Sequence, residues 1–145
     1  MGFVKIWIHL VWTTKRREPL LTREIRPCIF RHIRENARRK GIFIDHINGY
    51  DEHVHCLISL RVGQNIDKVL MLLKGESSNW INKNNLIGKK FEWQKEYFAA
   101  SVSESGINRV REYIRNQERH HKKRSYNREW KEIEEKYKFE TFVSG

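Results

Sequence analysis

Apolar side chains alternate with polar or aromatic ones along residues 4–13, from Val4 and Ile6 onward. A period of two is typical of a β-strand, and apolar residues in both alternating sets indicate that both faces of the strand are covered. A basic run at residues 15–17 and then Pro19 end the pattern. We expect the first strand over residues 4–13.

The next segment changes to a helical period. Apolar residues recur there at every fourth position: Ile25, Ile29, Ile33 and Ala37. Arg31, Arg34, Arg38 and Arg39 lie mostly off this stripe. Thr22 offers a cap, Pro27 favours a start near residue 27 and Gly41 supplies a stop. The pattern predicts an amphipathic, strongly basic helix that ends before Gly41.

Two β-rich runs follow, at residues 42–47 and 53–60. Asn48-Gly49 supplies turn residues between them, so the two runs predict a hairpin. Asn65 can then cap a second helix that ends in the polar stretch 82–85. Its buried side is expected to consist of the apolar residues Ile66, Val69, Leu70, Leu73, Trp80 and Ile81.

The last part of the chain predicts one more strand and two helices. Residues 97–102 have a β-favouring composition, and Gly106 follows shortly after them. A third helix, reaching the basic run 120–124, is predicted by the spacing of Ile107, Val110 and Ile114. A short fourth helix is predicted by the spacing of Trp130, Ile133 and Tyr137.

The resulting order is β-α-β-β-α-β followed by helices. This order is typical of an α+β, ferredoxin-like fold, in which an antiparallel sheet carries two helices on one face. No repeat or low-complexity tract divides the chain, so we expect a single domain over residues 1–145, with a core at about 3–124 and a basic, helical extension at about 125–145. Many functions share this topology, so the site residues must decide between them.

The charge balance points to a polyanionic partner. The chain has 29 lysines and arginines against 18 aspartates and glutamates, a formal net charge of +11. An excess of this size most often indicates nucleic acid. No apolar run is long enough to span a bilayer and no signal peptide is recognisable, so we expect a cytoplasmic protein without a membrane partner. Cys28 and Cys56 have apolar neighbours and no CxxC spacing, and we interpret both as core residues.

Two histidines stand out on the third predicted strand. His53 and His55 are two residues apart, so both side chains leave the same face of the strand, away from the two packing helices. From that face two imidazoles can bind one cation. A histidine pair on a strand is also compatible with a half-exposed or hydrogen-bonded surface, and the spacing leaves both interpretations open.

A tyrosine and a glutamine share one face of the third predicted helix. Tyr113 and Gln117 are four residues apart, at the edge of the apolar stripe. Tyr113 could simply complete that stripe with its hydroxyl in water. It could also be a nucleophile beside a metal ligand, because a phenol that attacks a phosphodiester benefits from a nearby cation.

Together these residues resemble a known family. The order of His53-Val54-His55, then Trp93-Gln94 and Tyr97-Phe98, then Tyr113-Ile114-Arg115-Asn116-Gln117 resembles that of the single-tyrosine HUH transposases of small insertion sequences. The similarity extends from the first strand and its Thr13-Thr14-Lys15 exit to the end of the tyrosine helix.

The resemblance implies a chemistry for these residues. His53, His55 and Gln117 would bind a divalent ion, Mg²⁺ or Mn²⁺, while Tyr113 attacks a DNA phosphate to give a 5′-phosphotyrosine and a free 3′-hydroxyl. The implied substrate is single-stranded DNA folded into hairpins at the ends of a mobile element. The implied assembly is a homodimer in which the tyrosine helix completes the site of the partner subunit, and Gly106 would serve as the hinge of that helix.

Several basic residues are candidates for contacts with DNA phosphates. They lie at the exit of the first strand, on the second helix and after the tyrosine helix: Lys15, Arg16, Arg17, Lys74, Arg119, Lys122 and Lys123. Four tryptophans, Trp7, Trp12, Trp80 and Trp93, could stack on bases, although packing within the protein suits most of them better.

Other functions remain open on the sequence. A rolling-circle initiator or relaxase shares the histidine pair but commonly carries a third histidine or a second tyrosine, whereas position 117 is glutamine. A domesticated relative that processes palindromes is a closer alternative. A non-catalytic module that binds single-stranded RNA or DNA on its sheet would need exposed aromatic residues, and the predicted exposed face of the third strand carries His53, His55 and Leu57 instead.

Overall fold

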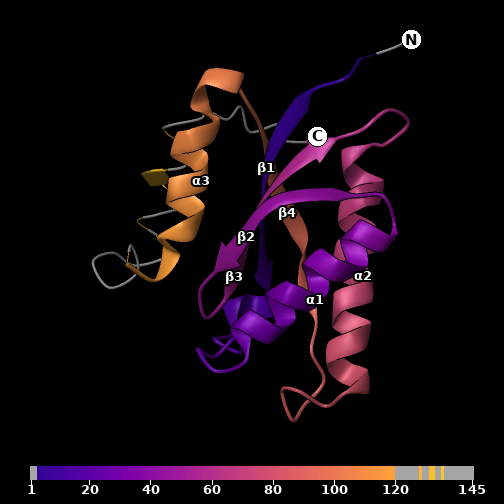
Figure 1. The fold of residues 1–145 in the computed structure, drawn as a ribbon. Coiled ribbons are helices and arrows are strands. Elements are labelled where there is room, and N and C mark those ends of the chain that lie inside the picture. The colour runs from indigo at the N-terminus through magenta and orange to yellow at the C-terminus, as the bar shows by residue number, and fades with distance from the viewer. Residues whose placement is uncertain (1–2, 120–127, 129–130, 133–134, 136–145) are drawn as a thin grey trace, which may run out of the picture.

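The computed structural model describes residues 3–119, 128, 131–132 and 135 (Figure 1). Its strands form one antiparallel sheet in the order β2-β3-β1-β4, built from β1 (Ile6–Thr14), β2 (Phe43–Gly49), β3 (His53–Leu60) and β4 (Trp93–Val102). The helices are α1 (Arg26–Arg39), α2 (Ile66–Lys83) and α3 (Ile107–Arg115), with short 3-10 turns η1 (Lys15–Arg17) and η2 (Glu104–Gly106). The predicted α+β, ferredoxin-like order is confirmed.

The sheet separates two layers of helices. Figure 1 shows α1 and α2 together on one face and α3 on the other. The main core lies between the sheet and the α1–α2 layer, where Val54, Cys56 and Ile58 of β3 are buried. This confirms the predicted inward side of β3, because alternate residues of a strand point to opposite faces.

The opposite face of β3 is covered by α3, contrary to the prediction from the sequence. Leu57 is fully buried in a second apolar cluster with three residues of α3: Ile107, Val110 and Ile114. An amphipathic helix must place its apolar stripe against another element, and β2 and β3 supply the surface. The expectation that His53, His55 and Leu57 form an exposed face is therefore wrong.

Gly49 belongs to β2 and not to the turn of the hairpin. It pairs with Val54, and the Tyr50 N–H donates to the carbonyl of His53, so the turn is formed by residues 50–52. A Cβ atom at position 49 would lie 2.1 Å from the His53 carbonyl oxygen. The glycine is needed because the two backbones approach closely here.

The first helix begins at Arg26 without a side-chain cap, since the Thr22 carbonyl, not its hydroxyl, accepts from the amides of Ile25 and Arg26. The predicted apolar face is confirmed by the burial of Ile29, Ile33 and Ala37. The interpretation of Cys28 as a core residue is wrong: Cys28 is exposed because it points off the apolar stripe, whereas Cys56 is buried in the core.

The starts of α2 and β4 can each be assigned to one residue. The Asn65 side chain accepts from the Lys68 amide, which confirms the predicted cap. Strand β4 begins at Trp93, earlier than predicted, and its pairing with β1 shifts between Trp12 and Thr14. Trp93 is buried edge-on against Trp12 at 6.0 Å between ring centres, so both indoles pack in the core and do not stack on bases.

The tyrosine helix is shorter than predicted. It ends at Arg115, Asn116 forms a turn, and residues 117–119 are helical again. Gly106 precedes it with an ordinary φ of −96°, so the conformation seen here does not require a glycine at that position. The predicted fourth helix at Trp130, Ile133 and Tyr137 lies outside the described residues. Among the described residues, no helix is long and apolar enough to cross a membrane.

Candidate functional site

The two histidines of β3 lie between the sheet and α3. His53 and His55 have no exposed side-chain surface, because the covering helix and the segment after it close over them. The pair is thus neither a half-exposed surface feature nor part of the main core. Residues from β1, β3 and the tyrosine helix contact it, although they are far apart in sequence.

His53 links the strand to Gln117. Its Nε2 lies 3.0 Å from Oε1 of Gln117, and its Nδ1 lies 2.8 Å from Oε1 of Glu52, the preceding residue. The Gln117 amide is oriented by its own nitrogen, which donates to the carbonyl of Tyr113 at 3.2 Å. Gln117 is itself fully buried. The predicted pairing of His53 with Gln117 in one site is therefore present in the folded chain.

His55 is held by His9, a residue for which the sequence pattern predicts no role. Nδ1 of His55 and Nε2 of His9, on β1, are 2.9 Å apart and share a hydrogen bond, and His9 is only 1% exposed. The alternation along β1 places His9 on the same face as Val11 and Thr13. The position of His9 beside His55 depends on the β1–β3 register, which pairs His9 with Leu57 and which the sequence pattern leaves undetermined.

Tyr113 lies over the histidines of its own chain. Its ring meets His55 edge-on with ring centres 5.4 Å apart, and it lies 6.3 Å from the ring of His9. It packs, partly buried, beside Val11 and Phe98. A single chain thus brings Tyr113 and the histidines together. Completion of the site by a partner subunit stays a prediction.

Three polar contacts attach the tyrosine helix to the rest of the fold. Arg111 donates two hydrogen bonds of 2.9 Å to the carboxylate of Asp45 on β2. Asn48, also on β2, donates to the carbonyls of Ile114 and Arg115 at 3.0 and 3.2 Å and thereby caps the helix end. These contacts fix the rotation of α3, and with it the direction of Tyr113.

The third contact joins the segment beyond the helix to α1. Arg26 is 5% exposed at its side chain and donates to Asp51 at 2.7 Å and to Glu118 at 2.8 Å. A buried guanidinium is stable only when its donors are satisfied, and Arg26 also donates to the Leu21 carbonyl. Glu118 follows Gln117, so Arg26 anchors the backbone that carries this residue.

The donor set suits a divalent cation. If Nδ1 of His53 donates to Glu52, Nε2 of the neutral ring carries no proton and points its lone pair toward Oε1 of Gln117. Oε1 is also an acceptor, so two acceptor atoms then face each other. A cation shared by the two atoms would stabilise this arrangement. Outer hydrogen bonds to ligating imidazoles are a common feature of metal sites. No three His, Cys, Asp or Glu side chains cluster as a metal site in the described part of the chain, so the amide of Gln117 is essential to this set.

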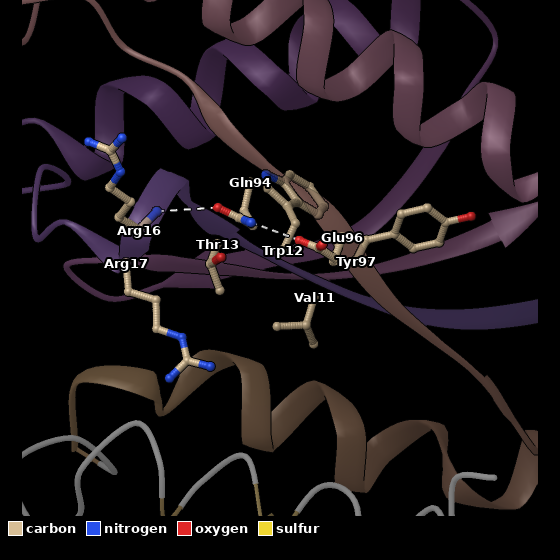
Figure 2. A pocket seen from close by; sticks show the side chains of 8 residues that line it. All are labelled: Val11, Trp12, Thr13, Arg16, Arg17, Gln94, Glu96 and Tyr97. Carbon is tan, nitrogen blue, oxygen red and sulfur yellow. Dashed lines mark hydrogen bonds between the residues drawn. The ribbon is translucent and has the colours of Figure 1, made fainter. Parts of the chain in front are cut away.

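The predicted DNA-contacting residues lie at different places around this site. Arg16 and Arg17 are exposed where β1 ends and line a pocket on that edge of the sheet (Figure 2). Lys15 forms an ion pair with Glu92 at 2.7 Å. Arg119 is exposed beyond Gln117. Lys122 and Lys123 lie outside the described residues.

Lys74 is engaged within the protein. Its Nζ donates to the carbonyls of Gln94 and Lys95 at 2.6 and 3.0 Å, near the shifted pairing of β4. Burial lowers the pKa of the Lys74 ammonium. The structure therefore gives Lys74 a role in holding β4, and its predicted contact with DNA stays untested.

Comparison with known proteins gives consistent results. The family described as "Transposase IS200 like" matches residues 3–117. The ISDra2 transposase TnpA of Deinococcus radiodurans is 28% identical over 123 residues, covering 80% of this chain and 87% of that protein.

Solved structures show the same fold. The crystal structure of a putative transposase from Deinococcus radiodurans R1 has a TM-score of 0.65 at 25% identity, covering 81% of this chain and 95% of that one. A REP-associated tyrosine transposase bound to a REP hairpin has a TM-score of 0.59 at 21% identity, covering 83% and 72% respectively. With its described core, its histidine–tyrosine cluster and a family match over most of its length, the chain belongs to the IS200-like transposases.

Proposed function

We propose that this transposase cleaves and rejoins single-stranded DNA at the ends of an insertion sequence, with Tyr113 as the nucleophile. One observation carries the proposal: Tyr113, His53, His55 and Gln117 converge between β3 and α3, although up to 64 residues separate them. A structural tyrosine on a helix does not need two buried imidazoles and a buried amide beside it.

In the proposed step the Oη atom of Tyr113 attacks the phosphorus of a phosphodiester. The Oη–P bond forms and the P–O3′ bond breaks, so the DNA is left with a 5′-phosphotyrosine and a 3′-oxygen that takes up a proton to become a hydroxyl. The proton of the tyrosine hydroxyl goes to solvent or to a general base. Attack by another 3′-hydroxyl reverses the step and rejoins DNA, so no nucleoside triphosphate is needed.

His53, His55 and Gln117 are the residues that would hold a divalent cation, Mg²⁺ or Mn²⁺, which when bound would polarise the phosphate and stabilise the charge of the leaving oxygen. Imidazole ligands favour Mn²⁺, whereas the greater abundance of Mg²⁺ favours Mg²⁺, so both ions fit the proposal. Glu52 and His9 would fix the direction of the two imidazoles through their Nδ1 atoms.

The proposed substrate is a hairpin-forming single strand. The solved REP-associated relative bound to a REP hairpin supports this class of DNA, and the net charge of +11 supports a polyanion. Arg16, Arg17 and Arg119 are the described cations proposed to contact its phosphates. A homodimer with sites completed between subunits belongs to the same proposal.

The experiment is covalent capture on a denaturing gel. The protein is incubated with labelled single strands from both flanks of its gene, with Mg²⁺, with Mn²⁺ or with EDTA. We expect a protein–DNA adduct that requires metal and is absent from Tyr113→Phe. Tyr50→Phe is the matched control, because Tyr50 lies in the β2–β3 turn and its ring contact with Arg26 survives the change.

Two further results decide the proposal. His53→Ala and Gln117→Ala should lose Mn²⁺ binding by titration calorimetry while keeping the circular dichroism spectrum of the folded chain. DNA binding without any adduct, on every strand and with both metals, would show a non-catalytic or domesticated binding protein instead. An adduct that persists in Tyr113→Phe would show that another residue is the nucleophile.

A further inference from the structure

A pocket opens beside the histidine–tyrosine site, where β1 ends and β4 begins. Its volume of about 530 Å³ lies within the range of about 300–1,000 Å³ that is usual for small-ligand sites. Val11 lines it and also packs with Tyr113, and Thr13 lines it from a position paired with His53. The pocket therefore adjoins the site of the proposed chemistry, and DNA bound at that site must pass close to the pocket.

The backbone at one wall is strained. Arg16 and Arg17 have φ values of 57° and 54°, in the left-handed region that residues other than glycine rarely adopt. Such strain costs roughly 1 kcal/mol or more per residue and tends to occur at functional sites. Its effect here is to direct the Arg16 N–H to Oε1 of Gln94 at 3.3 Å, while Arg17 lines the same pocket (Figure 2).

The opposite wall carries a fixed carboxylate. Nε2 of Gln94 donates to Oε2 of Glu96 at 2.8 Å, so the order Arg16 N–H, Gln94 amide, Glu96 carboxylate forms one hydrogen-bonded chain across the pocket (Figure 2). The hydrogen bond from Gln94 holds the pKa of Glu96 below its usual value. An ionised carboxylate has about four acceptor positions and no donor, so the hydrogen bonds from the Gln94 side chain and from the Glu96 backbone amide leave acceptor positions open.

The chemistry of this pocket selects a nucleobase. A carboxylate repels phosphate, so the group that Glu96 can bind on single-stranded DNA is a hydrogen-bond donor on a base. Adenine, cytosine and guanine each carry an exocyclic amino group, whereas the only ring donor of thymine, N3–H, lies between two carbonyl oxygens that repel a carboxylate. Arg17, on the facing wall, has the charge to balance the phosphate of the same nucleotide.

We propose that this pocket holds one nucleotide of the single-stranded DNA next to the cleaved phosphate, with Glu96 accepting from the amino group of its base and Arg17 contacting its phosphate. Gln94 positions Glu96 and does not itself read the base. The proposal rests on the proposed function for the position of this nucleotide relative to the cleaved bond. Its consequence is a sequence preference: an amino-bearing base is favoured over thymine at one position of the strand.

The test measures binding separately from cleavage. The Tyr113→Phe variant, which should bind DNA without cleaving it, is mixed with a library of single strands from the flanks of its gene. Each set of strands in the library has one short window of randomised bases, and successive sets move the window along the strand. The bound strands are recovered and sequenced. We expect an amino-bearing base to be enriched over thymine at one position. Glu96→Gln should lower that enrichment by about tenfold, since one base contact of this kind is worth about 1–3 kcal/mol. Glu35→Gln, with the same charge change on the exposed side of α1, should leave it unchanged.

The outcomes separate the two proposals. If the Glu96→Gln pool has the same base profile as its parent, or if thymine is bound equally well at every position, the base-reading role is wrong. If the base profile depends on Glu96 but the wild-type protein, which retains Tyr113, forms no adduct in the capture experiment, the pocket reads a base and the proposed cleavage is wrong. Arg17→Gln should weaken binding to all sequences alike and lower its salt dependence by about one ion; a loss limited to some sequences would contradict a phosphate contact.

Discussion

The Arg26 guanidinium donates a 2.8 Å hydrogen bond to Oε1 of Glu118, a residue 92 positions later in the chain. Arg26 lies in the first turn of α1, and Glu118 directly follows Gln117. The contact thus connects the helix layer on one face of the sheet to the segment that carries a proposed metal ligand on the other.

Loss of this contact should weaken metal binding more than folding. In Glu118→Ala, Arg26 keeps Asp51 and the Leu21 carbonyl, and water can replace the Glu118 carboxylate because that side chain is 49% exposed, so the melting temperature should change little. The Gln117 segment loses its anchor, and we expect Mn²⁺ affinity to fall about tenfold, the usual scale for outer contacts of a metal site. Titration calorimetry checks this, with Glu112→Ala on the exposed side of α3 as the control. Equal affinity in both variants would mean that Arg26 serves only the stability of the fold.

His9 should act on the metal site through His55. Its Nε2 is hydrogen-bonded to Nδ1 of His55 at 2.9 Å and is buried, so His9→Phe removes the contact while keeping an aromatic ring. We expect Mn²⁺ affinity to fall about 10- to 100-fold in His9→Phe. His9→Gln retains a polar group near Nδ1 and should recover part of the loss. Affinity that stays at the wild-type level in His9→Phe would rule out this positioning role.

The Asp45–Arg111 pair predicts an acid-sensitive attachment of the tyrosine helix. Burial raises the pKa of Asp45, but hydrogen bonds from Arg111 and His46 outweigh that effect and lower it overall. A carboxyl whose folded pKa is depressed adds stability at neutral pH, and this contribution is lost as the pH falls through that value. Asp45→Asn should therefore cost about 1–3 kcal/mol in the free energy of unfolding at pH 7.

Urea unfolding at two pH values checks whether the stability contributed by Asp45 decreases in acid, as predicted. The difference between Asp45→Asn and the wild type should shrink when the pH is lowered to about 3, because Asp45 then takes up a proton more readily in the unfolded wild-type chain than in the folded one. Glu35→Gln, on the exposed side of α1, should show a difference near zero at both values. A gap that widens in acid would contradict the ion pair as the source of the stability.

Gly49 should tolerate no side chain. A Cβ atom there would lie 2.1 Å from the His53 carbonyl oxygen and 3.1 Å from the ring of Phe30, so Gly49→Ala must push β2 and β3 apart. We expect a loss of about 3 kcal/mol or more in unfolding free energy. Gly75→Ala is the matched control, because Gly75 lies within α2 with open space around its Cα and alanine there should stabilise by about 0.5–1 kcal/mol. Similar effects at both positions would show that the close approach at Gly49 is unimportant.

Lys74 should support β4 and not the DNA. Lys74→Met removes the donor to the carbonyls of Gln94 and Lys95, so we expect a loss of about 1–3 kcal/mol in stability. The dependence of DNA affinity on salt should stay unchanged, whereas loss of a phosphate contact would lower that dependence by about one ion. Lys68→Met, exposed on the same helix, is the control for stability. A lower salt dependence in Lys74→Met would restore the DNA contact predicted from sequence.

Local patterns predicted the elements that depend on neighbours in sequence. The period of two placed β1 and β3 and put His53 and His55 on one face, and the Asn65 cap located the start of α2. Tyr113 and Gln117 were paired by their spacing, and the structure brings Gln117 to His53. These successes follow from the fixed repeats of strands and helices, which a sequence displays directly.

The errors concern features that depend on distant contacts. Gly49 has the chemistry of a turn residue, but the approach of the His53 carbonyl makes it part of β2. Cys28 has apolar neighbours in sequence, yet the rotation of α1 leaves it exposed. Lys74 is not among these errors: its ammonium donates to the carbonyls of Gln94 and Lys95, and its predicted contact with DNA stays a prediction.

The sequence by itself determined the order of the elements, the inward side of β3 and the identity of the residues able to carry the proposed chemistry, because periodicity and residue type are local properties. Only the tertiary structure decided that α3 covers the histidines, that His9 meets His55 and that Arg26 anchors Glu118. Each of these depends on the register of two strands or on the packing of a helix against a sheet, which are set by the total burial and polar satisfaction of residues far apart in the chain.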